Sequence, residues 1–248
     1  MTLEQFFAEN REVAVAFSGG VDSAYLLYAA TRYAARVKAY YVSTAFQPAF
    51  ELADARRLAA DVGADMQVLH VDVLMSGAVT ANPSDRCYHC KNTLFRQILR
   101  AAENDGFPVL LDGTNASDDA GDRPGMRALR ELSVRSPLRE CSLTKAEIRR
   151  LSKEAGLFTW DKPAYACLAT RIRTGEEITL QKLKQTEKAE GFLFGLGFRD
   201  FRVRMVGNTA KLELREADLP LLLEHREKIV TELRKDYDSV LLNLEVRK

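Results

Sequence analysis

Short apolar runs alternate with helical apolar spacing along the first two thirds of the chain. The apolar runs suit buried parallel strands and occupy residues 13–17, 37–43, 66–71 and 108–111. Helical spacing follows the sequence SGGVDS and recurs at 50–62, 92–103, 126–132 and about 144–155. Because strands that alternate with helices are typical of a parallel sheet covered on both faces, the pattern predicts an α/β fold with a doubly wound, mostly parallel sheet.

The pattern changes near residue 176. Helical spacing at 180–194 and 219–234 there accompanies apolar runs near 201–206, 210–214 and 240–246. This succession predicts a small α+β unit. We therefore expect two domains, residues 1–176 and residues 177–248.

Composition narrows the class of protein. Of 248 residues, 46% are hydrophobic, which is enough for a proper core and excludes disorder. The 36 Lys and Arg against 35 Asp and Glu give a net charge of +1, so no global field favours nucleic acid or anionic lipid, although a local basic patch stays open. No apolar run approaches the ~18 residues of a membrane span, and the N-terminus lacks the basic start of a signal peptide. The four cysteines are few for this length and are not arranged as the disulfide framework of a secreted protein, so they indicate a cytoplasmic chain.

The segment Ser18–Ser23, SGGVDS, lies between a predicted strand and a predicted helix. Its backbone N–H groups and the positive end of the helix can hold an anion, and Gly19 and Gly20 permit a close approach. The spacing matches neither the Walker pattern nor G-x-G-x-x-G. The alternative is a glycine turn in which Asp or Ser caps the helix.

SGGVDS resembles the pyrophosphate loop (PP-loop) of the ATP pyrophosphatases in all six positions. The resemblance implies that an acceptor oxygen is adenylated, that pyrophosphate leaves, and that a nucleophile then displaces AMP. It implies that phosphate oxygens are bound by Ser18, Gly19, Gly20 and Ser23. It also implies that Asp22 binds Mg²⁺ and is a catalytic residue. A cation is expected in any case, because pyrophosphate leaves poorly unless its charge is neutralised. Ser43 is a candidate for binding adenosine or, equally, a polar residue that ends a strand.

A second polar loop follows the strand predicted at 108–111. Its residues should open onto the same crevice as the first loop, because carboxyl ends of parallel strands share one edge. The candidates for binding nucleotide or metal are Asp112, Gly113, Thr114, Asn115, Asp119, Asp122 and Arg123. For Asp118 and Asp119 taken singly, a solvated loop with Asx turns is an equal alternative.

The cysteines form a C-x-x-C pair, Cys87 and Cys90, just ahead of the helix predicted at 92–103, and two single residues. Cys167 lies in an irregular stretch beside Arg171 and Arg173, whose cations would lower a thiol pKa. Cys141 fits a buried core thiol. Structural zinc, completed by Cys141 or His89, stays an alternative. Three thiolates, Cys87, Cys90 and Cys167, form the set that leaves one iron of a [4Fe–4S] cluster open.

Three blocks narrow the resemblance over essentially the whole chain: PSDRCYHCKNTLF, DGTNASDDAGDRPGMRALRELSVRSPL and WDKPAYACLATRIRTGEEIT. They look like the LarE family of PP-loop sulfur transferases. That similarity implies conversion of pyridinium-3,5-biscarboxylic acid mononucleotide to its bisthiocarboxylic acid, the precursor of the nickel-pincer cofactor of lactate racemase. In one family mode, a cysteine matching Cys167 gives up its sulfur and becomes dehydroalanine. In the other, three cysteines bind a [4Fe–4S] cluster that carries an added sulfide, and the three cysteines here resemble this mode.

The resemblance also implies that Glu190, Arg202 and Arg204 contact the substrate phosphate or assist the chemistry. Trp160 and Tyr165 could stack on a pyridinium ring or serve the core. A homo-oligomer, with a hexamer as the candidate, is a further implication. Three other functions stay open: a tRNA thiolase with a three-cysteine cluster, an amide-forming ligase that needs no cysteine, and a nucleotide-binding module without enzyme activity. The balanced charge disfavours the tRNA thiolase.

Overall fold

The computed structural model describes residues 1–118 and 124–247. Contacts divide the chain into one unit of Met1–Val73 and Asp85–Ala164 and a second of Leu74–Ser84 and Tyr165–Lys248. The sequence pattern marks its change later, at residue 176. The two positions differ because residues 165–176 carry no apolar periodicity that would assign them to either side.

The first unit contains a parallel sheet with the strand order β3-β2-β1-β4, which confirms the predicted α/β class. Its strands are β1 (Glu12–Ala16), β2 (Arg36–Ser43), β3 (Asp65–His70) and β4 (Val109–Leu111). The helices that belong to this unit are α1 (Leu3–Glu9), α2 (Val21–Tyr33), α3 (Ala49–Asp61), α5 (Arg86–Asn104), α6 (Pro124–Glu131), α7 (Pro137–Glu140) and α8 (Lys145–Glu154).

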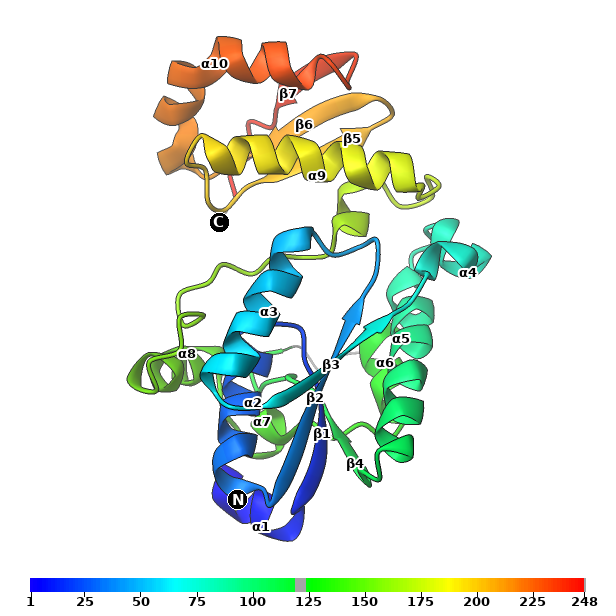
Figure 1. The fold of residues 1–248 in the computed structure, drawn as a ribbon. Coiled ribbons are helices and arrows are strands. Elements are labelled where there is room, and N and C mark those ends of the chain that lie inside the picture. The colour runs from blue at the N-terminus through cyan, green and yellow to red at the C-terminus, as the bar shows by residue number, and fades with distance from the viewer. Residues whose placement is uncertain (119–123, 248) are drawn as a thin grey trace. The chain divides into compact units, whose positions relative to one another are not determined.

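Helices cover both faces of this sheet (Figure 1). Alternate residues of β1 divide between two cores: Val13 and Val15 pack with α2, α3 and α8, whereas Ala14 packs with α5. Tyr41 and Tyr40 of β2 divide in the same way. This alternation follows from the period of two along a strand. It explains why the strands read as continuous apolar runs.

The loops after β1 and β4 emerge side by side, because these two strands are parallel neighbours that pair Val15 with Leu111. Chain that leaves the carboxyl ends of adjacent parallel strands enters one crevice. The fold therefore brings the segment that starts at Ser18 next to the segment that starts at Asp112.

Helices α1 and α5 begin where apolar spacing did not predict them. Helix α1 is opened by a capping box in which Thr2 and Gln5 bond each other's backbone N–H groups, a signal present in the sequence. Helix α5 begins at Arg86, so the prediction that Cys87 and Cys90 precede the helix is wrong. The first turns of α5 are polar, and apolar spacing alone therefore placed the start too late.

The second unit contains a three-stranded sheet with the order β5-β6-β7, in which β5 and β6 are antiparallel and β6 and β7 parallel. Its elements are α4 (Gly77–Thr80), η2 (Leu168–Arg171), α9 (Leu180–Gly195), β5 (Arg202–Val206), β6 (Thr209–Glu213), η3 (Glu216–Asp218), α10 (Leu219–Leu233) and β7 (Ser239–Leu242), while η1 (Val73–Met75) spans the division. The segment Leu74–Ser84 contacts the rest of this unit through Asn82, whose carbonyl oxygen accepts a hydrogen bond from Gly175 N at 2.8 Å. Over the described residues, no helix has the length and apolarity that crossing a membrane requires.

Candidate functional site

The segment Ser18–Ser23 is a tight turn that leads from β1 into α2. Gly19 adopts φ +74°, a backbone conformation that side chains rarely allow, and a Cβ there would meet Ala55 at 3.3 Å. The hydroxyls of Ser18 and Ser23 lie 3.0 Å apart, and Ser23 Oγ donates to Gly20 O at 3.2 Å. The first amides of α2 therefore open onto the same side as two serine hydroxyls, an arrangement that suits an anion.

The segment after β4 approaches this turn at van der Waals contact. A Cβ at Gly113 would stand 2.9 Å from Ser23 N, so only glycine fits. Asp112 is buried and accepts hydrogen bonds from Thr114 Oγ1 and, at 2.6 Å, from Ser136 Oγ. These bonds hold the Asp112 carboxylate in place beside the helix start.

A cavity of about 320 Å³ lies between the two loops, and we call it the polar cavity because most of the residues that line it carry polar side chains. It is lined by Ala16, Ser18, Gly20, Asp22, Ser23, Lys91, Phe95, Asp112, Gly113, Thr114 and Asp118. Most of the predicted loop residues are brought together here. Gly19, Asn115 and Ser43 do not line this cavity: Asn115 is buried and organises its own loop by accepting from Ser117 N at 2.8 Å, and Ser43 ends β2. The candidates Asp119, Asp122 and Arg123 lie outside the described residues.

Asp22 carries the electrostatic signal of the cavity. Its Oδ2 accepts from Lys145 Nζ at 2.6 Å, whereas its buried Oδ1 has no hydrogen-bond partner among the described residues. Burial raises the pKa of Asp22 above its usual value, Lys145 opposes this, and the charge of Asp118 raises it further. An unpartnered buried carboxylate oxygen near a second carboxylate fits a hard divalent cation such as Mg²⁺.

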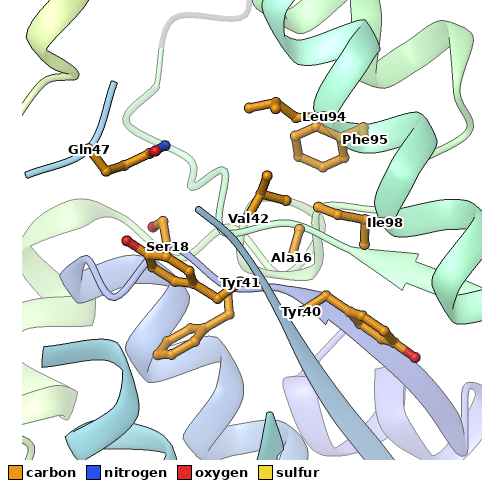
Figure 2. A pocket seen from close by; sticks show the side chains of 10 residues that line it. Ala16, Ser18, Tyr40, Tyr41, Val42, Gln47, Leu94, Phe95 and Ile98 are labelled. Atoms are coloured by element: carbon orange, nitrogen blue, oxygen red, sulfur yellow. The ribbon is translucent and has the colours of Figure 1, made fainter. Parts of the chain in front are cut away.

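A second, apolar cavity of about 130 Å³ adjoins the polar one, because both are lined by Ala16, Ser18 and Phe95. Figure 2 labels nine of its lining residues, Ala16, Ser18, Tyr40, Tyr41, Val42, Gln47, Leu94, Phe95 and Ile98, and the tenth is Phe17. Ser43 does not line this cavity either. The apolar and aromatic side chains that line this cavity, from the end of β2 and from α5, suit the faces of an aromatic ring.

Gln47 is the amide among these lining residues, and its orientation follows from its neighbour. Thr44 N, which can only donate, lies 3.0 Å from Gln47 Oε1, and Thr44 Oγ1 donates to the same oxygen at 2.7 Å. With Oε1 held by these donors, Nε2 is the end that offers hydrogen bonds to a ligand. The amide can therefore donate a hydrogen bond to an acceptor nitrogen of a ring.

Cys87 and Cys90 lie three residues apart in the first turns of α5, so both project from one side of the helix. Cys87 is exposed and Cys90 half-buried, and Arg86 Nη2 lies 3.8 Å from Cys87 Sγ. Within the described residues no group of three or more His, Cys, Asp or Glu has the geometry of a metal site. Cys87 and Cys90, on one side of α5, could supply two of the three thiolates that the predicted iron–sulfur cluster needs. The third predicted ligand, Cys167, belongs to the other unit.

The remaining cysteines have different surroundings. Cys141 packs against the core that contains α2 and α8, and burial raises the pKa of its thiol, as expected of a core cysteine. Cys167 caps the short helix η2, where its carbonyl oxygen accepts from Thr170 N at 2.9 Å and from Thr170 Oγ1 at 2.8 Å. The backbone at Cys167 is therefore well defined.

Glu190 is the centre of a buried network within the second unit. It accepts from Arg171 Nε at 2.7 Å, from Val203 N at 2.9 Å and from Tyr165 Oη. Arg171, expected as a cation beside Cys167, is almost fully buried and uses two nitrogens on Glu190. Burial and the neighbouring Glu190 raise the pKa of Tyr165 above its usual value.

The two arginines of β5 are also engaged. Arg202 is buried and lies 5.4 Å from the Tyr165 ring centroid, and burial lowers the pKa of its guanidinium. Arg204 pairs with Glu213 at 2.8 Å and donates to Thr170 O at 2.6 Å. In the first unit, Lys153 Nζ lies over the ring of Trp160, 4.5 Å from the ring centroid. The roles of these residues stay predictions.

Sequence reasoning missed three lysines near the turn. Lys91 lines the polar cavity, Lys145 binds Asp22, and Lys162 Nζ lies 3.4 Å from Gly19 O. Lys91 follows Cys90 directly in one of the blocks, which was the available signal. Lys162 lies in the block that begins at Trp160, whereas Lys145 lies in no block. For both lysines the partners are more than a hundred residues away in sequence.

The first unit has the features of a PP-loop nucleotide-binding domain. A glycine turn joins a buried parallel strand to the start of a helix, and a carboxylate beside it can bind a cation. The family model described as asparagine synthase matches residues 4–118. An uncharacterized protein of Synechocystis sp. is 39% identical over 215 residues, 86% of this chain and 80% of that protein. The pyridinium-3,5-bisthiocarboxylic acid mononucleotide synthase of Lactiplantibacillus plantarum is 32% identical over 235 residues, 94% of this chain and 85% of that protein. The chain belongs to the LarE family, whose members are ATP-using sulfur transferases.

A more distant relative is a tRNA-specific 2-thiouridylase of Thermotoga petrophila. It is 26% identical over 191 residues, which cover 59% of this chain and 52% of that protein. This likeness is limited to part of each chain.

Proposed function

We propose that the chain uses ATP to convert the carboxylates of pyridinium-3,5-biscarboxylic acid mononucleotide to thiocarboxylates, releasing AMP and pyrophosphate. The observation that carries this proposal is the polar cavity beside Ser18–Ser23, with the unpartnered Oδ1 of Asp22, joined to an apolar cavity. Family membership supplies the substrate class. The product serves the nickel-pincer cofactor of lactate racemase.

In the proposed pose, the adenine ring occupies the apolar cavity and the triphosphate the polar one. Gln47 Nε2 donates to a ring nitrogen, and the hydroxyls of Ser18 and Ser23 donate to phosphate oxygens. Asp22 and Asp118 would hold Mg²⁺, which when bound neutralises charge on the departing pyrophosphate. Lys91, from α5, adds a positive charge to the lining of the polar cavity.

The chemistry then has two displacements. A carboxylate oxygen of the substrate attacks the α-phosphorus, the bond to the β-phosphate oxygen breaks, and pyrophosphate leaves. A sulfur nucleophile attacks the acyl carbon of this adenylate, the bond to the phosphate oxygen breaks, and AMP leaves. The amides at the start of α2 and Lys91 stabilise the charge that develops on pyrophosphate. Arg202 and Arg204 are proposed to bind the substrate phosphate.

For the sulfur source we propose a [4Fe–4S] cluster bound by Cys87, Cys90 and Cys167. When bound by three thiolates, it offers one open iron that can carry an added sulfide. The position of Cys87 and Cys90 on one side of α5 supports this choice. Transfer of the Cys167 sulfur itself is the alternative within the family.

The test is anaerobic purification with quantitation of iron and acid-labile sulfide in four variants. Cys87→Ala, Cys90→Ala and Cys167→Ala are expected to lose the cluster, and Cys141→Ala, the matched control in the core, is expected to keep it. Mass spectrometry of the Cys167 peptide after turnover should find it intact. Loss of the elements of H₂S at Cys167 would replace the cluster with the sacrificial route, and full activity of Cys167→Ala would exclude both.

A tRNA thiolase is the second candidate, favoured by the partial likeness to the Thermotoga 2-thiouridylase. The net charge of +1 argues against tight binding of a polyanion. Binding of bulk tRNA is the discriminating measurement. Tight binding whose affinity falls steeply with salt would favour the thiolase, and no binding at low salt favours the mononucleotide.

The assembly is a further proposal. By family resemblance we expect a homo-oligomer, with a hexamer as the specific expectation. Light scattering coupled to size-exclusion chromatography measures the mass in solution, and a monomer at micromolar concentration would refute this expectation.

A further inference from the structure

Lys162 is a largely buried lysine to which no role has been assigned. Its side chain is 14% exposed, and its Nζ lies 2.8 Å from Asp54 Oδ2 and 3.4 Å from Glu51 Oε1, both on α3. The same nitrogen lies 3.4 Å from the carbonyl oxygen of Gly19. Lys162 therefore joins α3 to the glycine turn through three oxygens.

The contact with Gly19 O fixes the orientation of a peptide plane. A trans peptide is planar, so the carbonyl of Gly19 and the N–H of Gly20 point in opposite directions. With the carbonyl held by Lys162, the Gly20 N–H faces the other way and donates a hydrogen bond to Ser18 Oγ at 3.4 Å. Both Ser18 and Gly20 line the polar cavity.

The backbone of Lys162 is itself anchored. Arg149 of α8 donates from Nη2 to Lys162 O at 2.9 Å and from Nη1 to Trp160 O at 2.6 Å. The lysine thus extends from a fixed point of the chain. Because Gly19 adopts positive φ, where glycine has several accessible conformations, an external hold on its carbonyl selects one of them.

We propose that Lys162 is a positioning residue that holds the Gly19–Gly20 peptide with its N–H directed at the pyrophosphate part of ATP. The proposal rests on the ATP pose proposed above. Lys162 Nζ contacts Asp54, Glu51 and the Gly19 carbonyl, so its proposed effect on phosphate binding runs through the backbone. Its removal should therefore weaken ligands that fill the phosphate part of the cavity, and it should spare AMP, which lacks the β- and γ-phosphates.

The test measures the affinities of Mg²⁺-pyrophosphate and of AMP for the full-length protein by calorimetry. Lys162→Gln alone leaves buried Glu51 without its cation, which can unfold the protein for an unrelated reason. The double variant Glu51→Gln/Lys162→Gln removes one charge of each sign and still lacks the hold on Gly19 O. Arg57→Gln is the matched control, since Arg57 is an exposed residue of α3 that pairs with Asp61.

We expect the dissociation constant of pyrophosphate to rise about tenfold in the double variant and that of AMP to stay within about twofold. The control should match the wild type for both ligands. Unchanged pyrophosphate affinity in the folded double variant, or an equal loss for AMP, would overturn the role of Lys162. Failure of the wild type to bind pyrophosphate or ATP would instead refute the proposed ATP site, so the two failures are distinguishable.

Discussion

Gly113→Ala tests whether the two loops must touch for the nucleotide site to form. A Cβ at this position would stand 2.9 Å from Ser23 N and 3.2 Å from Ser23 Cα, both backbone atoms. Ordinary contact begins at 3.4 Å, so the loop and the start of α2 must separate by 3.4 − 2.9, or 0.5 Å. Backbone atoms yield less readily than a flexible side chain.

The cost can be worked from this displacement. Overpacking by one carbon costs typically about 1–3 kcal/mol in unfolding free energy. A hydrogen bond to a charged phosphate contributes about 1.5–3 kcal/mol. Loosening one such bond at the start of α2 therefore corresponds to roughly tenfold in affinity for ATP, or about 1.4 kcal/mol. We expect Gly113→Ala to lose both stability and ATP affinity by these amounts.

The assays are urea unfolding and calorimetric binding of a non-hydrolysable ATP analogue. Gly191→Ala provides the matched control, because its added Cβ meets nothing within 4 Å and it lies in the interior of α9. That control should gain stability by about 1 kcal/mol, since alanine has the higher helix propensity. If Gly113→Ala matched the wild type in both unfolding free energy and ATP affinity, the close approach of the two loops would be irrelevant and the reasoning refuted.

Three further predictions concern single side chains. Asp22→Asn should abolish the dependence of ATP binding on Mg²⁺ without lowering stability at neutral pH. The pKa of Asp22 is raised mainly by burial, so its ionisation destabilises the fold as pH rises from the ordinary value of 3.8 through the raised folded-state pKa, above which the effect is constant; urea titrations at several pH values measure this. Glu190→Gln should lower the unfolding free energy by about 3–5 kcal/mol, because it leaves buried Arg171 without its carboxylate partner. An unfolding free energy equal to that of the wild type in urea would show that this ion pair does not stabilise the fold. Gln47→Leu should raise the KM for ATP while leaving kcat nearly unchanged, as loss of uniform binding requires; a lowered kcat with unchanged KM would exclude adenine reading.

Sequence patterns predict most of the first unit because its signals are local. The strands of the parallel sheet are buried on both faces, so each reads as an apolar run, and the Thr144–Glu147 capping box fixes the start of α8. SGGVDS fixes the turn for the same reason: its residue types are required by its own backbone. The start of α5 was misplaced because its first turns carry polar residues.

The cations of the site could not be predicted in this way. Lys162 meets Gly19 across 143 positions and Asp54 across 108, and it lies in a stretch without periodicity. Its partners are fixed only once β1, α3 and α8 have packed. The resemblance makes Glu190 a catalytic candidate, but only the fold reveals the donors from Arg171, Val203 and Tyr165 that surround its carboxylate. Long-range pairing of this kind leaves no trace in a single sequence.

The charge of the polar cavity makes a divalent cation a requirement for the proposed chemistry. Its described lining contains three carboxylates, Asp22, Asp112 and Asp118, against one lysine, Lys91. Lys145 offsets part of this charge from outside the lining through Asp22 Oδ2, and burial, followed by the charge of Asp118, still raises the pKa of Asp22. A triphosphate would bring more negative charge into a space that already disfavours it. The helix start and Lys91 cannot balance that sum alone, because a helix terminus contributes only about half a charge. The carboxylates that repel free ATP are the groups that would bind Mg²⁺, so the cavity selects the metal–nucleotide complex over the free nucleotide.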